Sequence, residues 1–138
     1  MDVTLARNSN RPLSPHLQIY KFIPTMIMSV LHRATGVALY GGTVLVAVWL
    51  IAAASGERYY DFAAWAFSSW LGLVVLFGYT WVLMHHMLGG LRHFVWDLGH
   101  LFAKEQSTKL AYLTGVGSVT LTALLWGGVF GYRFLVSA

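Results

Sequence analysis

The placement of the charged residues constrains this chain more than any other feature. Of its 138 residues, nine are Lys or Arg and five are Asp or Glu. They leave three long uncharged stretches: Ala34 to Gly56, Phe62 to Leu91 and Leu110 to Tyr132. Each stretch exceeds the roughly 20 residues that a helix needs to cross about 30 Å of hydrocarbon, where a full charge is costly. The sequence therefore predicts an all-α membrane protein with three transmembrane helices.

The loops between these stretches are short, which predicts an up-down-up bundle within a single domain that covers residues 1–138. The expected spans lie near residues 29–56, 62–91 and 110–132, after an amino-terminal segment at residues 1–28. All three prolines fall within the first 24 residues. That segment is therefore not expected to form a long helix.

The basic residues predict the orientation of the bundle. Seven of them lie on the amino-terminal side or in the second loop, at Arg7, Arg11, Lys21, Arg33, Arg92, Lys104 and Lys109. Only Arg58 and Arg133 lie on the opposite side. Lys and Arg concentrate in cytoplasmic loops, so the amino terminus is expected in the cytoplasm. As a separate expectation, the protein is a multi-pass protein of a bacterial inner membrane.

Composition excludes several classes of protein. Charged residues make up 10% of the chain, against about 25% in soluble domains, so an ordinary soluble domain is excluded. Cysteine is absent, which excludes disulfides, thiolate metal sites and iron–sulfur ligation by this chain. The basic residues flank apolar helices, so the net charge of +4 reports topology and nucleic acid is not an expected partner.

One face of the second expected span is typical of a haem site. His86, Gly89, Gly90 and His93 are spaced i, i+3, i+4 and i+7, which places them on one face of a helix. The glycines would let a flat macrocycle approach the backbone, and an imidazole nitrogen of His86 would bind its iron. His85 points about 100° away. The alternatives are a histidine that only bonds a neighbouring helix, and a proton relay or transporter.

Cationic donors near this face fit the two propionates of a haem. Arg92 and His93 lie one to two turns beyond His86, toward the predicted cytoplasmic side. The first span begins with a second set at the same spacing: Ser29, His32, Arg33 and Gly36. There Arg33 would hold a propionate or a reduced quinone oxygen, and Ser29 would donate to a quinone carbonyl. In the alternative interpretation, Arg33 extends to lipid headgroups.

Small residues recur on the third span at Ala123, Gly127 and Gly131, and on the first at Gly36, Gly41 and Gly42. These faces are expected to contact other helices, some of them from a different chain. Hydrolysis lacks a Ser, His and acid constellation, and no metal-ligand cluster with zinc spacing is present.

Two stretches of the chain resemble a known family. RPLSPHLQIY at Arg11 to Tyr20 continues to SVLHRATG at Ser29 to Gly36, and HMLGGLRHFVWDLG covers His86 to Gly99. They are similar to the signatures of the large cytochrome b membrane-anchor subunit of succinate dehydrogenase. The resemblance extends over nearly the whole chain.

The resemblance implies an anchor that is not itself catalytic. It would hold the iron–sulfur and flavoprotein subunits at the membrane beside a second small membrane-anchor subunit, while electrons pass from succinate to ubiquinone. It implies that His86 is an axial ligand of haem b, with the other axial histidine in the small subunit. His32, Arg33 and His93 would lie near the propionates, and Ser29 and Arg33 at the ubiquinone site. A fumarate reductase anchor and a structural anchor without haem are the alternatives.

Overall fold

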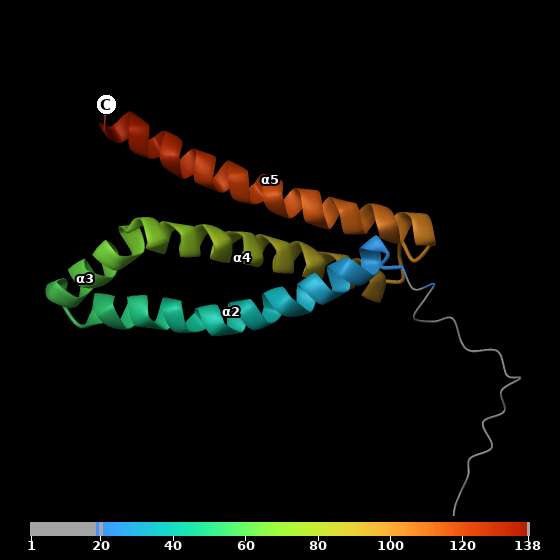
Figure 1. Cartoon of the computed structure of the whole chain (residues 1–138), viewed down its shortest axis with the longest axis horizontal. Coiled ribbons are helices and arrows are strands. Elements are labelled where there is room, and N and C mark those ends of the chain that lie inside the picture. Colours follow the sequence, from blue (N-terminus) through green and yellow to red (C-terminus); the bar gives the residue numbers. More distant parts are fainter. Residues whose placement is uncertain (1–18, 20, 138) are drawn as a thin grey trace, which may run out of the picture.

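The computed structural model describes Ile19 and residues 21–137. The RPLSPH motif and most of the predicted amino-terminal segment lie outside these residues. Four helices follow one another: α2 (Pro24–Ala54), α3 (Glu57–Ser68), α4 (Trp70–Asp97) and α5 (Lys104–Ser137). Consecutive long helices run in opposite directions, and the short α3 caps the hairpin between α2 and α4 (Figure 1).

The helices α2, α4 and α5 contain 31, 28 and 34 residues, and all three are long and apolar enough to cross a membrane. At about 1.5 Å per residue, even the shortest extends about 42 Å, which exceeds the hydrocarbon thickness. Three candidate membrane helices are therefore confirmed in number. Pro24 stands in the first turn of α2, where its missing N–H has no intrahelical acceptor to lose.

The boundaries of the second span differ from the prediction. The predicted range 62–91 is divided, because α3 ends at Ser68 and α4 begins at Trp70. Ser69 has an extended backbone, and its hydroxyl oxygen accepts the N–H of Gly72 at 3.1 Å as the amino-terminal cap of α4. The turn before α3 uses Gly56 at φ 109°, a conformation that other residues rarely adopt.

The interior of the bundle is polar and its surface is apolar. Among the described residues, the only buried hydrophobic ones are Ala63 and Ala111. The buried polar or charged ones are Thr35, His85, Arg92, Thr114, Ser118 and Thr122. Large side chains such as Trp70, Leu113 and Phe134 are exposed. Lipid gives apolar side chains no reason to turn inward, so helices in a membrane associate through small and polar residues.

The contacts of α4 with α2 and with α5 differ in kind. Between α2 and α4 the contact is close: the ring of Tyr79 occupies the position where a side chain on Gly42 would begin. Between α4 and α5, the indole N–H of Trp126 donates to the hydroxyl of Thr80 at 3.3 Å. Beyond Trp126 no described residue of α5 is buried, and α5 diverges from α4 toward its carboxyl end (Figure 1).

Candidate functional site

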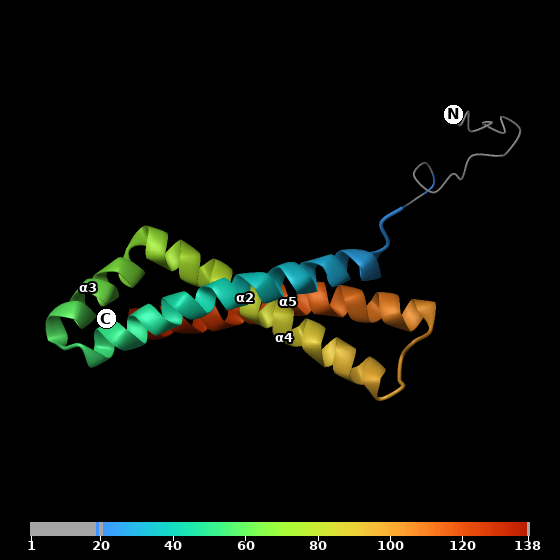
Figure 2. The ribbon, with the colours of Figure 1, turned by 90° about the horizontal axis from the view of Figure 1, so that it is seen from below.

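Two glycines bring the imidazoles of α2 and α4 together. A Cβ atom placed on Gly36 would lie 3.0 Å from Cε1 of His86, and one placed on Gly89 would collide with Nδ1 of His32. The two rings stack with centroids 4.1 Å apart and planes 8° from parallel. The histidines of the first and second spans, His32 and His86, therefore lie at one level of the bundle. Figure 2 shows how α4 crosses the other long helices.

Hydrogen bonds determine which nitrogen of His86 carries the proton. Its Nδ1 lies 3.1 Å from the backbone carbonyl oxygen of His32 and 3.3 Å from the hydroxyl oxygen of Thr35. The Thr35 hydroxyl donates to the carbonyls of Leu31 and His32, so its oxygen is an acceptor toward His86. Both partners accept, which requires Nδ1–H and leaves the lone pair on Nε2. Metal-binding histidines are commonly oriented by such a bond from the second ring nitrogen.

Two further aromatic side chains, His93 and Trp96, extend the group of rings that His32 and His86 form. The His93 ring lies 5.0 Å from that of His32 and 5.2 Å from the indole of Trp96. Nδ1 of His32 is buried and has no hydrogen-bond partner among the described residues. We call His32, His86, His93 and Trp96 the α2–α4 site. It contains an imidazole nitrogen without a hydrogen-bond partner among the described residues, Nδ1 of His32, beside the ordered ring of His86.

The described residues do not form a site for a bare metal ion. In the part of the chain that the structure describes, no three His, Asp or Glu side chains converge to hold an ion. The stacked rings of His32 and His86 face each other with their π surfaces. The lone pairs of two rings stacked in this way do not point at a common metal between them. His86 is the residue whose second ring nitrogen could bind the iron of a macrocycle.

His85 has a different environment from that of its neighbour. It is 1% exposed and faces α5, where its Nδ1 lies 3.3 Å from the hydroxyl oxygen of Ser118. The Ser118 hydroxyl donates to the carbonyl of Gly115, so it accepts the proton of His85. His85 thus bonds a neighbouring helix and lies on the other side of α4 from Gly36 and His32.

Ser29 and Arg33 lie on α2 at the same end of the bundle as His32. Arg33 is exposed and Ser29 is half-buried. The hydroxyls of Thr35 and Thr43 donate to carbonyls of α2, whereas that of Ser29 makes no hydrogen bond among the described residues. The structure therefore leaves both predicted quinone-site groups available as donors.

The sequence did not single out Thr35 or the polar face of α5. Thr114, Ser118 and Thr122 recur every fourth residue and are all buried. Hydroxyls at this spacing on an otherwise apolar span indicate the face that turns toward the interior. That signal was present in the sequence and would have found the partner of His85.

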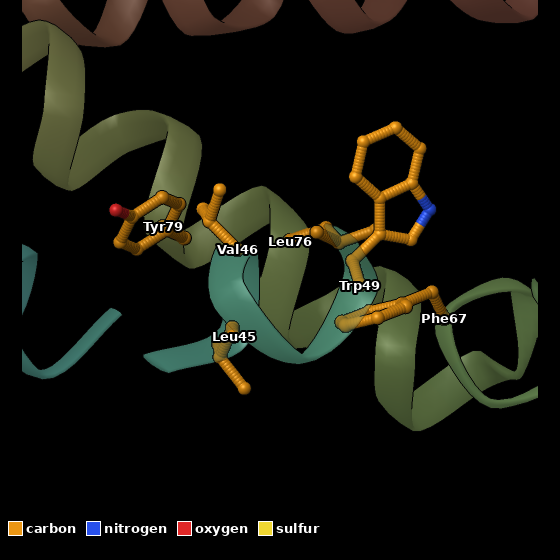
Figure 3. A pocket seen from close by; sticks show the side chains of 6 residues that line it. All are labelled: Leu45, Val46, Trp49, Phe67, Leu76 and Tyr79. Atoms are coloured by element: carbon orange, nitrogen blue, oxygen red, sulfur yellow. The ribbon is translucent and has the colours of Figure 1, made fainter. Parts of the chain in front are cut away.

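A cavity near the opposite end of the bundle has a different character. It measures about 310 Å³ and is lined by Leu45, Val46, Trp49, Phe67, Leu76 and Tyr79 (Figure 3). These walls are apolar or aromatic and carry no ionisable imidazole or guanidinium group. The donors that a haem or a quinone requires are gathered instead at the α2–α4 site.

Comparison with known proteins identifies the family. Residues 7–125 match the family model described as succinate dehydrogenase/fumarate reductase transmembrane subunit. The chain belongs to this family. The cytochrome b556 subunit of succinate dehydrogenase from Paracoccus denitrificans is 44% identical over 115 residues, which cover 83% of this chain and 88% of the relative. The mitochondrial cytochrome b560 subunit from Mus musculus is 41% identical over 127 residues, with 88% and 71% covered.

This membership confirms the family and the general function that the sequence predicted. The chain is a membrane subunit of succinate dehydrogenase, of the cytochrome b type that anchors the complex. The relatives are named cytochromes b556 and b560, which implies haem b in the family. The role of each residue in this chain stays a prediction.

The contact between Gly89 and His32 supports a stability prediction. Gly89→Ala places a methyl group where the His32 ring now lies, and overpacking of this kind costs about 1–3 kcal/mol. We expect a lower thermal midpoint for the purified complex, measured by tryptophan fluorescence. Gly78→Ala is the matched control, because a Cβ atom there meets nothing within 4 Å. Equal midpoints for the two variants would show that His32 does not occupy this position.

Proposed function

We propose that this succinate dehydrogenase subunit carries haem b through His86 and contributes Ser29 and Arg33 to the site where ubiquinone is reduced. The observation that carries the proposal is the ordered ring of His86, whose Nδ1–H is held by the His32 carbonyl and the Thr35 hydroxyl. Nε2 makes no hydrogen bond with any described residue, so its lone pair is available to bind iron.

The glycine-lined contact supports the same assignment. Gly36 and Gly89 have no side chains, which lets the imidazoles of His32 and His86 come together between α2 and α4. Haem supplies a one-electron carrier when it is bound. His32, with its orphaned Nδ1, and His93 beside it would donate to propionate oxygens, and Arg33 would add a fixed positive charge.

Arg92 was also predicted beside the propionates. That role stays a prediction. Its side chain lines a cleft between α4 and α5, and we propose a different ligand for it.

The quinone-site assignment rests on two available donors. Reduction places negative charge on a quinone oxygen, and a cation in a poorly screened environment stabilises that charge. Arg33 would supply this cation, while the free hydroxyl of Ser29 would donate to a carbonyl oxygen. Mostly apolar walls with a few placed donors suit a quinone.

A second small membrane subunit would complete the site. This chain is proposed to supply one ligand of the haem, His86, and the partner subunit would supply the other. The carboxyl-terminal half of α5 offers a contact surface, because Gly127 and Gly131 have nothing within 4 Å and the helix stands apart from α4. The iron–sulfur and flavoprotein subunits would then bind on the cytoplasmic side of the bacterial inner membrane.

Purification with an affinity tag on this chain tests the proposal. We expect a flavin-containing protein, an iron–sulfur protein and a second small membrane protein to co-purify. A reduced-minus-oxidised spectrum of the same sample should show a b-type band. A complex that contains the flavin and iron–sulfur proteins without a b-type band would identify a structural anchor without haem. Recovery of the tagged chain alone and colourless would contradict the whole assignment.

A further inference from the structure

Among the described residues, Arg92 is a buried cation without a hydrogen-bond or ion-pair partner. The residue is 3% exposed, and its Nε and Nη1 atoms are buried without hydrogen-bond partners. Its guanidinium carbon lies 5.1 Å from the ring centroid of Trp96, whose indole Nε1 is also buried and unpartnered. Cations at membrane depth are normally paired, because an uncompensated charge is costly there. All of these unpartnered atoms are donors, which indicates an anionic acceptor.

A cleft between α4 and α5 gives such an acceptor access to Arg92. It measures about 180 Å³, and Arg92 is the only charged side chain among the described residues that line it. Thr114 also lines it, and the other walls are aliphatic, formed by Leu88, Leu91, Val95, Leu110 and Leu113. Leu91 and Leu113 are exposed on the outer surface of the bundle. The cleft therefore opens toward lipid, between hydrocarbon walls and beside a cation.

We place Arg92 near the boundary between headgroups and acyl chains, because α4 is longer than the hydrocarbon thickness and ends close to this residue. It lies five residues before the end of α4 at Asp97, about 7.5 Å along the helix axis. Groups held about 5–10 Å into the interface reach this boundary. Lys109, which directly precedes the lining residue Leu110, is exposed near the start of α5 and adds positive charge at this end of the cleft.

We propose that the α4–α5 cleft binds the phosphate group of an anionic phospholipid from the leaflet at this end of the bundle. Arg92 is its buried counter-charge, the Trp96 indole N–H is a second donor nearby, and the aliphatic residues contact the first part of an acyl chain. Basic pockets between transmembrane helices on the cytoplasmic side are suited to such headgroups. The cleft lies between α4 and α5, whereas the stacked imidazoles lie between α2 and α4, and Trp96 contacts residues of both. The proposal does not rest on haem binding.

The test compares lipid retention by the purified complex. Wild-type, Arg92→Gln and Arg133→Gln complexes are delipidated in detergent and titrated with dioleoylphosphatidylglycerol, and bound lipid is measured by phosphorus assay and native mass spectrometry. We expect the preference for phosphatidylglycerol over phosphatidylcholine to fall about fivefold in Arg92→Gln. Arg133→Gln should keep the wild-type preference, because Arg133 is exposed near the far end of α5.

A second variant blocks the cleft while leaving the charge in place. Leu113 is 66% exposed at the cleft, so Leu113→Trp should fold normally and exclude the lipid. The same loss of preference is expected, with the haem absorbance unchanged in both variants. Wild-type lipid preference in Leu113→Trp and Arg92→Gln would overturn the proposal. Loss of the haem band in Arg92→Gln with lipid retained would also overturn it, by assigning Arg92 to a propionate.

Discussion

Replacement of His86 by alanine is expected to remove the b-type absorption band from the complex. The ring of His86 is held by two acceptors on Nδ1, so its Nε2 has a defined direction that no neighbouring group reproduces. His32 cannot substitute, because its ring stacks parallel to that of His86 and its approach to α4 is defined by Gly89. A spectrum of the dithionite-reduced complex measures the effect.

His85→Ala is the matched control for this prediction. The residue precedes His86, carries the same side chain and faces α5, where it bonds Ser118. Its loss removes a buried hydrogen bond and opens a cavity, which we expect to cost about 1–3 kcal/mol of stability with the absorption band retained. A lost band in His85→Ala together with an unchanged spectrum in His86→Ala would reverse the assignment of the ligand.

The sequence could predict that His86, Gly89 and His93 share a helix face, because that conclusion needs only the helical repeat. It could not choose between His85 and His86 on physical grounds, since both are imidazoles on one apolar helix. The choice of the haem ligand depends on which residues of α2 and α5 contact each of the two histidines. The structure places glycine and a backbone carbonyl of α2 beside His86, and a serine of α5 beside His85.

The charge pattern located the membrane helices but not the break between α3 and α4. Residues 62–91 contain no charge, so the length criterion treats them as one span, whereas the Ser69 cap starts a new helix inside the stretch. The surroundings of Arg92 are a second feature that the sequence could not give. Its position in the sequence predicts a place beside the propionates, which stays a prediction, whereas the cleft that it lines with Leu110 and Thr114 of α5 could be found only from the structure.

Arg33→Ala is expected to lower electron transfer to ubiquinone about tenfold to a hundredfold while leaving succinate oxidation by an artificial dye intact. A hydrogen bond to a charged group contributes about 1.5–3 kcal/mol, which is the source of this range. The dye accepts electrons upstream of the membrane site, so its reduction reports assembly of the complex and the quinone assay reports the site. Arg33→Lys keeps the charge but loses the planar donor geometry. Its rate of ubiquinone reduction should lie between those of the wild type and Arg33→Ala.

Arg58→Ala is the matched control, because Arg58 is equally exposed but lies on α3 at the opposite end of the bundle. Parallel loss of both activities in Arg33→Ala would indicate failed assembly. Unchanged activity in both assays would mean that Arg33 only extends to lipid headgroups, as its exposure on α2 also permits. A selective loss in the quinone assay, absent in Arg58→Ala, is the result that the geometry of Ser29, His32 and Arg33 predicts, because these groups lie on one turn of α2.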